Sequence, residues 1–133
     1  MTQESRVTRT QGELEAAACT LINRVVCDIT GRGPRSISAT LHGRRLIVIL
    51  EGILTRTDET LLKSSTGAQA GTDVVQTLRK QLMRGARSSL VAGLTTTFGQ
   101  SPVGVLHDIA PDADEEAFVF RFLDEPRAAK RRA

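Results

Sequence analysis

The chain has 133 residues, of which 40% are apolar and 25% are charged. This length suits one domain with a single hydrophobic core, and the composition is far from that of a disordered chain. No run approaches the roughly 20 apolar residues of a membrane span, and the polar residues 1–11 lack the apolar stretch of a secretory signal. The sequence therefore predicts a soluble, cytoplasmic protein without membrane insertion.

The formal net charge of +3 is concentrated at the C-terminus. Four of the 18 basic residues lie in the last seven positions, which leaves fourteen basic against fifteen acidic residues over residues 1–125. A protein that binds nucleic acid usually carries its basic charge on the folded body, so this distribution weakens that function class. We predict a flexible segment at residues 1–10, one domain at residues 11–125 and a basic, disordered tail at residues 126–133.

The first predicted element is a helix that begins after Thr10. Thr10 and Glu13 have the spacing of a capping box, apolar residues follow at helical spacing, and Gly31 ends the pattern. Alternation over residues 37–41 and the apolar run at residues 46–50 then predict a hairpin whose second strand is central and covered on both faces. A cap at residues 55–58 predicts a short helix over about residues 56–63.

A small-residue connector at residues 64–71 precedes a long predicted helix, which we expect to begin at Thr72 or Asp73 and to end near Phe98. Its first half has a predicted core stripe of Val75, Leu78 and Leu82. A basic face lies opposite and is most simply explained as a solvated surface; it consists of Lys80, Arg84 and Arg87.

The second half of this helix has two sides that require cover. One is a stripe of small residues at Gly85, Ser89 and Gly93, which permits another element to approach closely. The other is an apolar surface that we predict to contact a second subunit, formed by Leu90, Val91 and Leu94. The sequence thus predicts a homo-oligomer, most simply a dimer.

A second hairpin completes the predicted fold. Val103 and Val105 begin a third strand, an acidic loop spans residues 108–116, and alternation around Phe118 and Phe120 marks the fourth strand. The expected class is α+β, with two helix-plus-hairpin halves that form a mainly antiparallel four-stranded sheet with helices on one face.

One segment has the residues for anion binding. Gly31, Arg32, Gly33 and Arg35 combine free backbone amides with forked guanidinium donors, which suit carboxylate, phosphate or bicarbonate. The alternative is a helix stop and turn with solvated or carboxylate-paired arginines.

No catalytic constellation is visible, and we predict no catalytic residue, metal or cofactor. The acidic residues between Asp108 and Glu116 lack the spacing of a calcium loop, which favours a solvated loop. His42 and His107 could bind a metal only if the fold brought them together, and exposed hairpin positions explain them more simply.

Several segments together resemble the MpsC-like family of bacterial proteins. They are the Gly-Arg-Gly-Pro-Arg-Ser-Ile run at residues 31–37, the strand at residues 46–50, Leu54-Thr55 with Glu59 and Leu62, then Val75, Arg79 and Leu82, Gly99, and the Phe-rich strand at residues 118–123. The resemblance covers about residues 12–124. The chain departs from the family pattern in the connector at residues 64–71 and in its basic tail.

The resemblance implies a component of a presumed bacterial system that moves cations or bicarbonate and generates membrane potential together with integral-membrane partners. It implies no catalytic or ligand residue. We therefore predict a non-enzymatic accessory or regulatory protein that binds a partner, for which a membrane transport component is one candidate, and senses an anion at Arg32 and Arg35. The alternative is a nucleic-acid-binding module that uses the basic face and the tail.

Overall fold

The computed structural model describes residues 9–63 and 68–128. Its elements follow the chain in this order: α1 (Gln11–Thr30), β1 (Ser36–His42), β2 (Arg45–Glu51), α2 (Arg56–Leu62), α3 (Ala68–Phe98), β3 (Gly104–Ala110), the short 3-10 helix η2 (Pro111–Ala113) and β4 (Glu115–Arg121). The predicted N-terminal segment lies almost wholly outside the described residues, as do residues 129–133 of the predicted tail.

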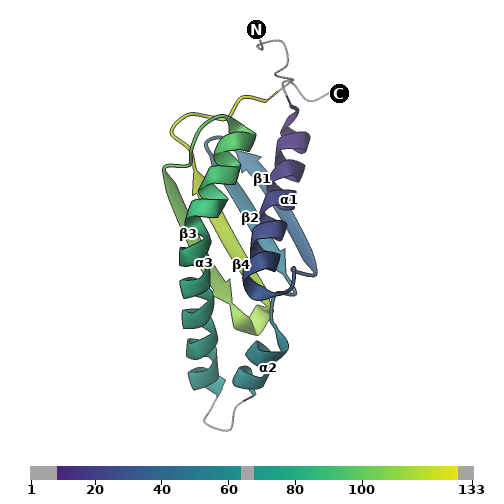
Figure 1. Ribbon diagram of the computed structural model, residues 1–133, viewed down its shortest axis with the longest axis vertical. Helices are drawn as coiled ribbons and strands as arrows, with labels where there is room; N and C mark the ends of the chain where they lie inside the picture. The colour runs from purple at the N-terminus through teal and green to yellow at the C-terminus, as the bar shows by residue number, and fades with distance from the viewer. Residues whose placement is uncertain (1–8, 64–67, 129–133) are drawn as a thin grey trace.

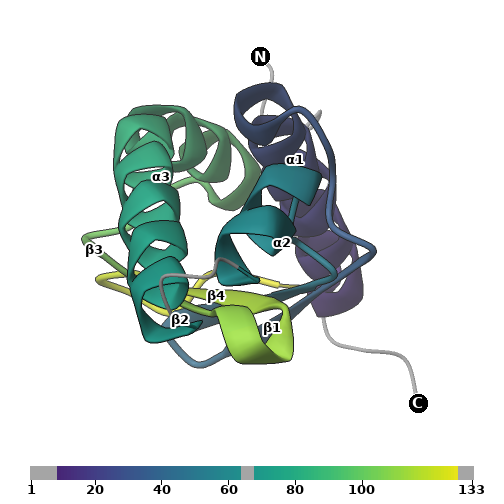
Figure 2. The ribbon, with the colours of Figure 1, turned by 90° about the horizontal axis from the view of Figure 1, so that it is seen from below.

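The four strands form one antiparallel sheet in the order β1-β2-β4-β3. Figures 1 and 2 show that α1 and α3 lie side by side across one face of this sheet, while no helix of the described residues covers the other face. The predicted α+β class, with a four-stranded antiparallel sheet and helices on one face, is confirmed. β2 is central, as predicted, but the helices cover only one of its two faces.

The hydrophobic core lies between the helices and the sheet. Side chains of β2 and β4 alternate, so that Leu46, Val48, Phe118 and Phe120 are buried beneath the helices. Gly93 allows α3 to approach α1 closely, because a Cβ atom there would lie 2.4 Å from Leu21 Cδ1. At Gly93, the stripe of small residues thus packs against α1 of the same chain.

Local capping fixes the helix ends that the sequence predicted. Thr10 and Glu13 form a capping box at the start of α1, and Gly31 ends that helix in the left-handed region at φ 86°. Thr55 and Asp58 form a second capping box at the start of α2. Each of these interactions needs only residues that are three or four positions apart, which is why the sequence alone identifies them.

The long helix differs from the prediction in two respects. It begins at Ala68 rather than at Thr72 or Asp73, so residues 68–71 of the predicted connector belong to the helix. The stripe that faces the core also lies on a different side of the helix from the predicted one, because Leu78 is 41% exposed whereas Arg79 is 1% exposed. The buried stripe therefore consists of Val75, Arg79, Met83, Ala86, Leu90 and Leu94.

The third and fourth strands are longer than predicted. β3 extends to Ala110, so that Asp108 lies in the strand and not in a loop. The solvated loop predicted at residues 108–116 is therefore wrong, because only η2 and Asp114 separate the strands and Glu116 is 1% exposed.

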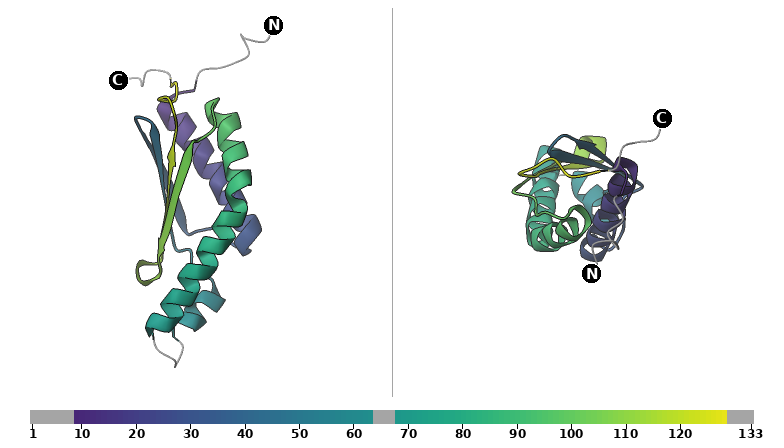
Figure 3. Two further views of the ribbon diagram at one scale, coloured as in Figure 1. Left: turned by 90° about the vertical axis from the view of Figure 1, so that its left-hand side faces the viewer. Right: turned by 90° about the horizontal axis from the view of Figure 1, so that it is seen from above.

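The start of α3 projects beyond the sheet. The N-terminal part of this helix lies past the end of the strands, beside α2 (Figures 1 and 3). Gly71 is the contact point, because a Cβ atom there would lie 2.0 Å from the Leu61 carbonyl oxygen. Among the helices of the described chain, none combines the length and the apolar character that a membrane crossing requires.

Candidate functional site

A cavity of about 280 Å³ opens between α3 and the edge of the sheet formed by β3 and β4. Its polar lining comes from α3 and β3 and comprises Lys80, Arg84, Arg87 and His107. Its apolar lining comprises Met83, Leu90, Val105, Phe118 and Phe120. We call this cavity the basic pocket.

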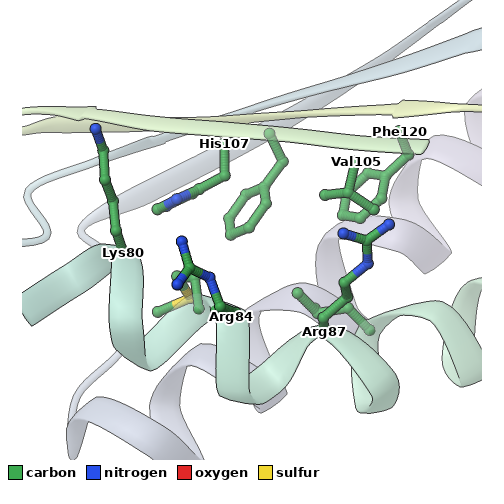
Figure 4. A pocket seen from close by; sticks show the side chains of 9 residues that line it. Lys80, Arg84, Arg87, Val105, His107 and Phe120 are labelled. Atoms are coloured by element: carbon green, nitrogen blue, oxygen red, sulfur yellow. The ribbon is translucent and has the colours of Figure 1, made fainter. Parts of the chain in front are cut away.

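The basic pocket exists because α3 presents one flank to β3. Lys80, Arg84 and Arg87 are spaced at i, i+4 and i+7, which places them on one side of the helix. Figure 4 shows their side chains rising from α3 toward the strands, with His107 and Val105 opposite them. The predicted basic face is therefore one surface, but it flanks the core and borders a cavity instead of lying opposite the core.

Aromatic rings form the floor of the basic pocket. The ring centroids of His107 and Phe118 are 4.6 Å apart, and Phe118 stacks on Phe120 at 5.6 Å with an interplanar angle of 8°. His107 is positioned by Glu116, because its Nε2 lies 2.6 Å from Glu116 Oε2. Glu116 therefore orients the imidazole in the wall of the cavity.

A buried ion pair lies directly behind His107. Arg79 Nη2 donates a hydrogen bond of 2.7 Å to Glu116 Oε1, and the two side chains are 2% and 0% exposed. Burial raises the pKa of Glu116, but the hydrogen bond with His107 and the charge of Arg79 outweigh it, so that this pKa lies below its ordinary value. Glu116 is therefore a carboxylate that holds both His107 and Arg79.

The rim of the pocket carries more positive charge than the carboxylates nearby neutralise. Lys80 Nζ lies 3.4 Å from Asp108 Oδ1 in an exposed ion pair. Within residues 9–63 and 68–128, neither Arg84 nor Arg87 forms an ion pair. Two guanidinium groups beside an apolar floor suit an organic anion, because the charge meets forked donors while the apolar part leaves water.

The glycine-arginine segment that the sequence predicted as an anion site has a different environment. Arg32 donates from Nη1 to the Leu54 carbonyl at 2.9 Å and from Nη2 to the Gly52 carbonyl at 3.3 Å. The Arg35 backbone N–H also donates to Gly52, at 3.2 Å. These bonds tie the end of α1 to the segment before α2 and use two donors of Arg32. Anion binding at Gly31, Arg32, Gly33 and Arg35 stays a prediction.

The surface predicted to contact a second subunit is not exposed at two of its three positions. Leu90 and Leu94 are 1% and 0% exposed because they face the sheet from α3, and Leu90 also lines the basic pocket. Val91 is half-buried. Leu90 and Leu94 therefore belong to the core of the chain, and their assignment to a partner surface is wrong.

The structure does not bring the two histidines together. His42 and His107 lie in the two edge strands of the sheet, β1 and β3. In the part of the chain that the structure describes, no three His, Cys, Asp or Glu side chains are grouped so that they could hold a metal ion.

Sequence reasoning missed Arg79, His107 and Glu116 as neighbours of the site. One signal was present in the sequence. Glu116 precedes Phe118 by two residues, which places it on the buried face of the strand, and Arg79 lies four residues from both Val75 and Met83 on α3. Two opposite charges at core positions predict a buried pair.

Comparison with protein families adds one relationship. The family model described as Na⁺-translocating membrane potential-generating system (MpsC) matches residues 10–124. No curated protein and no solved structure matches the chain with significance. The matched region contains every helix and strand of the described fold and the whole basic pocket. The chain belongs to the MpsC family.

Proposed function

We propose that this protein is a non-enzymatic accessory or regulatory component of a sodium-translocating system and that it binds a small organic anion in the basic pocket. The family supports the first part, because its description concerns Na⁺ translocation and membrane potential. The observation that carries the second part is the cavity in which Arg84 and Arg87 lie over an aromatic floor.

The lining of the pocket defines the chemical class of the anion. Five of the nine lining residues are apolar, so a strongly hydrated ion such as bicarbonate would gain nothing from most of the cavity. A carboxylate on a short apolar or aromatic body satisfies both parts of the lining. A volume of about 280 Å³ is at the lower end for small-molecule pockets, which favours a metabolite-sized ligand.

Isothermal titration calorimetry and thermal melts at constant ionic strength test this proposal. The probes are benzoate, hexanoate, bicarbonate, phosphate and chloride. We expect benzoate or hexanoate to raise the melting temperature, because a ligand at 100 times its Kd stabilises the folded state by about 2.7 kcal/mol. The double variant Arg84→Gln/Arg87→Gln should lose this effect.

The matched control is Arg24→Gln/Arg56→Gln, which removes the same charge from exposed positions on α1 and α2. It should bind the anions as the unmodified protein does. Equal loss in both double variants would show a nonspecific charge effect and would reject the pocket as the site. Binding of phosphate alone would reject the organic anion.

A nucleic-acid interface is the second candidate, and one observation favours it. Arg87 also borders a second hollow of about 350 Å³ whose lining includes Arg45 and Arg121, so basic side chains continue around the β3 edge. Oligonucleotide binding that weakens steeply with salt and is reduced in Arg45→Gln/Arg87→Gln would support this function. If this second function is correct, adding benzoate should not displace the bound oligonucleotide.

A further inference from the structure

The face of the sheet opposite the helices has an apolar centre. Side chains that point away from α1 and α3 include Ile47 and Ile49 of β2, Ala117 and Val119 of β4, and Leu106 of β3. Leu106 is 71% exposed, and Figure 3 shows that no helix or strand within residues 9–63 and 68–128 lies against this side. We call this surface the open face. A solvated sheet face normally alternates to polar residues, so an apolar centre on two central strands requires an explanation.

On the central strands β2 and β4, charged residues lie at the two ends of the open face, with one sign at each end. At one end Arg45 of β2 is the register partner of Arg121 of β4, and at the other end Glu51 is the partner of Glu115. Like charges directly opposite each other on neighbouring strands are destabilising. Within the described chain, no ion pair to an opposite charge relieves any of these four side chains.

We propose that the open face is the contact surface of a symmetric dimer of this chain. A two-fold axis that lies between the sheets and runs perpendicular to the strands reverses the strand direction of the second copy. The arginine pair of each copy then lies over the glutamate pair of the other, and the apolar centres meet. An axis parallel to the strands would place arginine on arginine, so the charges select the first arrangement.

The charge pattern identifies the occupant as a second copy. The open face carries two arginines and two glutamates in mirrored positions, so it is complementary to itself, whereas a basic or acidic partner would match only one end. The hollow of about 350 Å³ beside Arg45, Arg121 and Leu106 provides space for an approaching carboxylate side chain.

The size of the open face predicts a modest affinity. Seven-residue strands are about 23 Å long and neighbouring strands are about 4.8 Å apart, which gives a contact about 20 Å across. Two sheets pack face to face at about 10 Å with their strands roughly aligned. A contact of this extent is at the small end of specific interfaces, so we expect dissociation in the micromolar range.

Charge reversal with remixing tests the proposal by sedimentation equilibrium across the micromolar range. Arg45→Glu/Arg121→Glu makes both ends of the open face acidic, and Glu51→Lys/Glu115→Lys makes both ends basic. The unmodified chain should dimerise, each double variant alone should be monomeric, and their equimolar mixture should form a heterodimer. A monomeric unmodified chain, or a mixture that stays monomeric, would overturn the proposal.

Controls separate loss of the dimer from loss of the fold. Both double variants keep a like-charge pair at each end and should show the circular dichroism spectrum of the unmodified chain. Leu106→Asp should abolish the dimer, whereas Leu78→Asp, at an exposed apolar position on α3, should not. Retention of the dimer in Leu106→Asp would show that another surface forms the contact.

Crosslinking tests the direction of the axis. In a background with Cys19 and Cys27 replaced by Ala, a short bis-maleimide should join a chain carrying Arg45→Cys to one carrying Glu51→Cys. Crosslinking of Arg45→Cys chains to each other should be slower. The reverse preference would show an axis parallel to the strands and would contradict the charge pairing.

Discussion

Arg79 of α3 and Glu116 of β4 form an ion pair that is completely enclosed by the core, with Nη2 2.7 Å from Oε1. The two residues are 37 positions apart in the chain, so the pair fixes how α3 lies on the sheet. Glu116 also contacts His107, which connects the ion pair to the basic pocket.

Removal of one partner of this pair should be much more costly than removal of both. Glu116→Leu leaves a buried guanidinium without a carboxylate, and we expect a loss of about 3–5 kcal/mol in the free energy of unfolding, measured with urea. Arg79→Met/Glu116→Leu should recover most of it, since a well-packed apolar pair replaces both charges. A double variant no more stable than Glu116→Leu would contradict this view of the core.

The exposed pair of Lys80 and Asp108 provides the matched control. Its atoms are 3.4 Å apart and both side chains are exposed. Asp108→Asn should therefore change the free energy of unfolding by less than about 1 kcal/mol.

Stability should fall in acid because of Glu116. Its pKa is lower in the folded chain than in the unfolded chain, so folding releases a proton in the window between the two pKa values. The resulting stability is fully present above the ordinary glutamate pKa of about 4.3 and is lost as the pH falls through the lowered pKa. Urea titrations of the unmodified chain and of Glu116→Gln across this window should show a shallower acid decline in the variant.

Two glycines of α3 should respond in opposite directions to alanine. At Gly71 the new Cβ atom would lie 2.0 Å from the Leu61 carbonyl oxygen, which is backbone and cannot turn aside, so we expect a loss of about 1–3 kcal/mol. At Gly85 nothing lies within 4 Å, and alanine should stabilise the helix by about 0.5–1 kcal/mol. Thermal melts of the two variants side by side measure the difference, and shifts of the same sign would contradict the contact at Gly71.

Asp114 should be the most sensitive position in the turn between β3 and β4. Its Oδ1 accepts the backbone N–H groups of Ile53 at 2.8 Å and Leu54 at 2.9 Å, and its φ of 53° is in the left-handed region. Asp114→Ala loses both bonds and strains the backbone, so we expect a loss of about 2–4 kcal/mol.

Two further variants separate these effects in chemical denaturation. Asp114→Asn keeps an acceptor oxygen and tolerates the positive φ, so it should be the least affected. Asp114→Gly also loses both hydrogen bonds but adopts the positive φ without strain, so its stability should lie between those of the other two variants. If Asp114→Gly is as stable as Asp114→Asn, the two hydrogen bonds contribute nothing.

Local interactions account for what the sequence predicted. The capping boxes at Thr10 and Thr55 and the alternation of β4 depend on residues a few positions apart, and they yield the helices, the strands and the class of fold. The spacing of Lys80, Arg84 and Arg87 also placed them on one surface.

Interactions across the fold account for what the sequence did not predict. The position of the buried stripe on α3 depends on a carboxylate 37 residues from Arg79, so the signal in the sequence becomes clear only when both residues are placed at core positions of their elements. The basic face became the rim of a pocket because the strand order β1-β2-β4-β3 places β3 at the edge beneath α3. Leu90 and Leu94 were predicted to form an interface because the sequence does not show what covers them. The sheet that buries them is formed by segments that are distant in the chain.

The projection of α3 past the sheet divides the helix into two parts with different protection. Its start packs against α2 through the close approach of Gly71 to Leu61, whereas its later turns share the main core. Local opening is easiest where few buried contacts hold an element. The amide hydrogens of α2 and of the start of α3 should therefore exchange with solvent together and earlier than those beside Leu90, so that this end of the molecule can rearrange around a partner while the sheet stays folded.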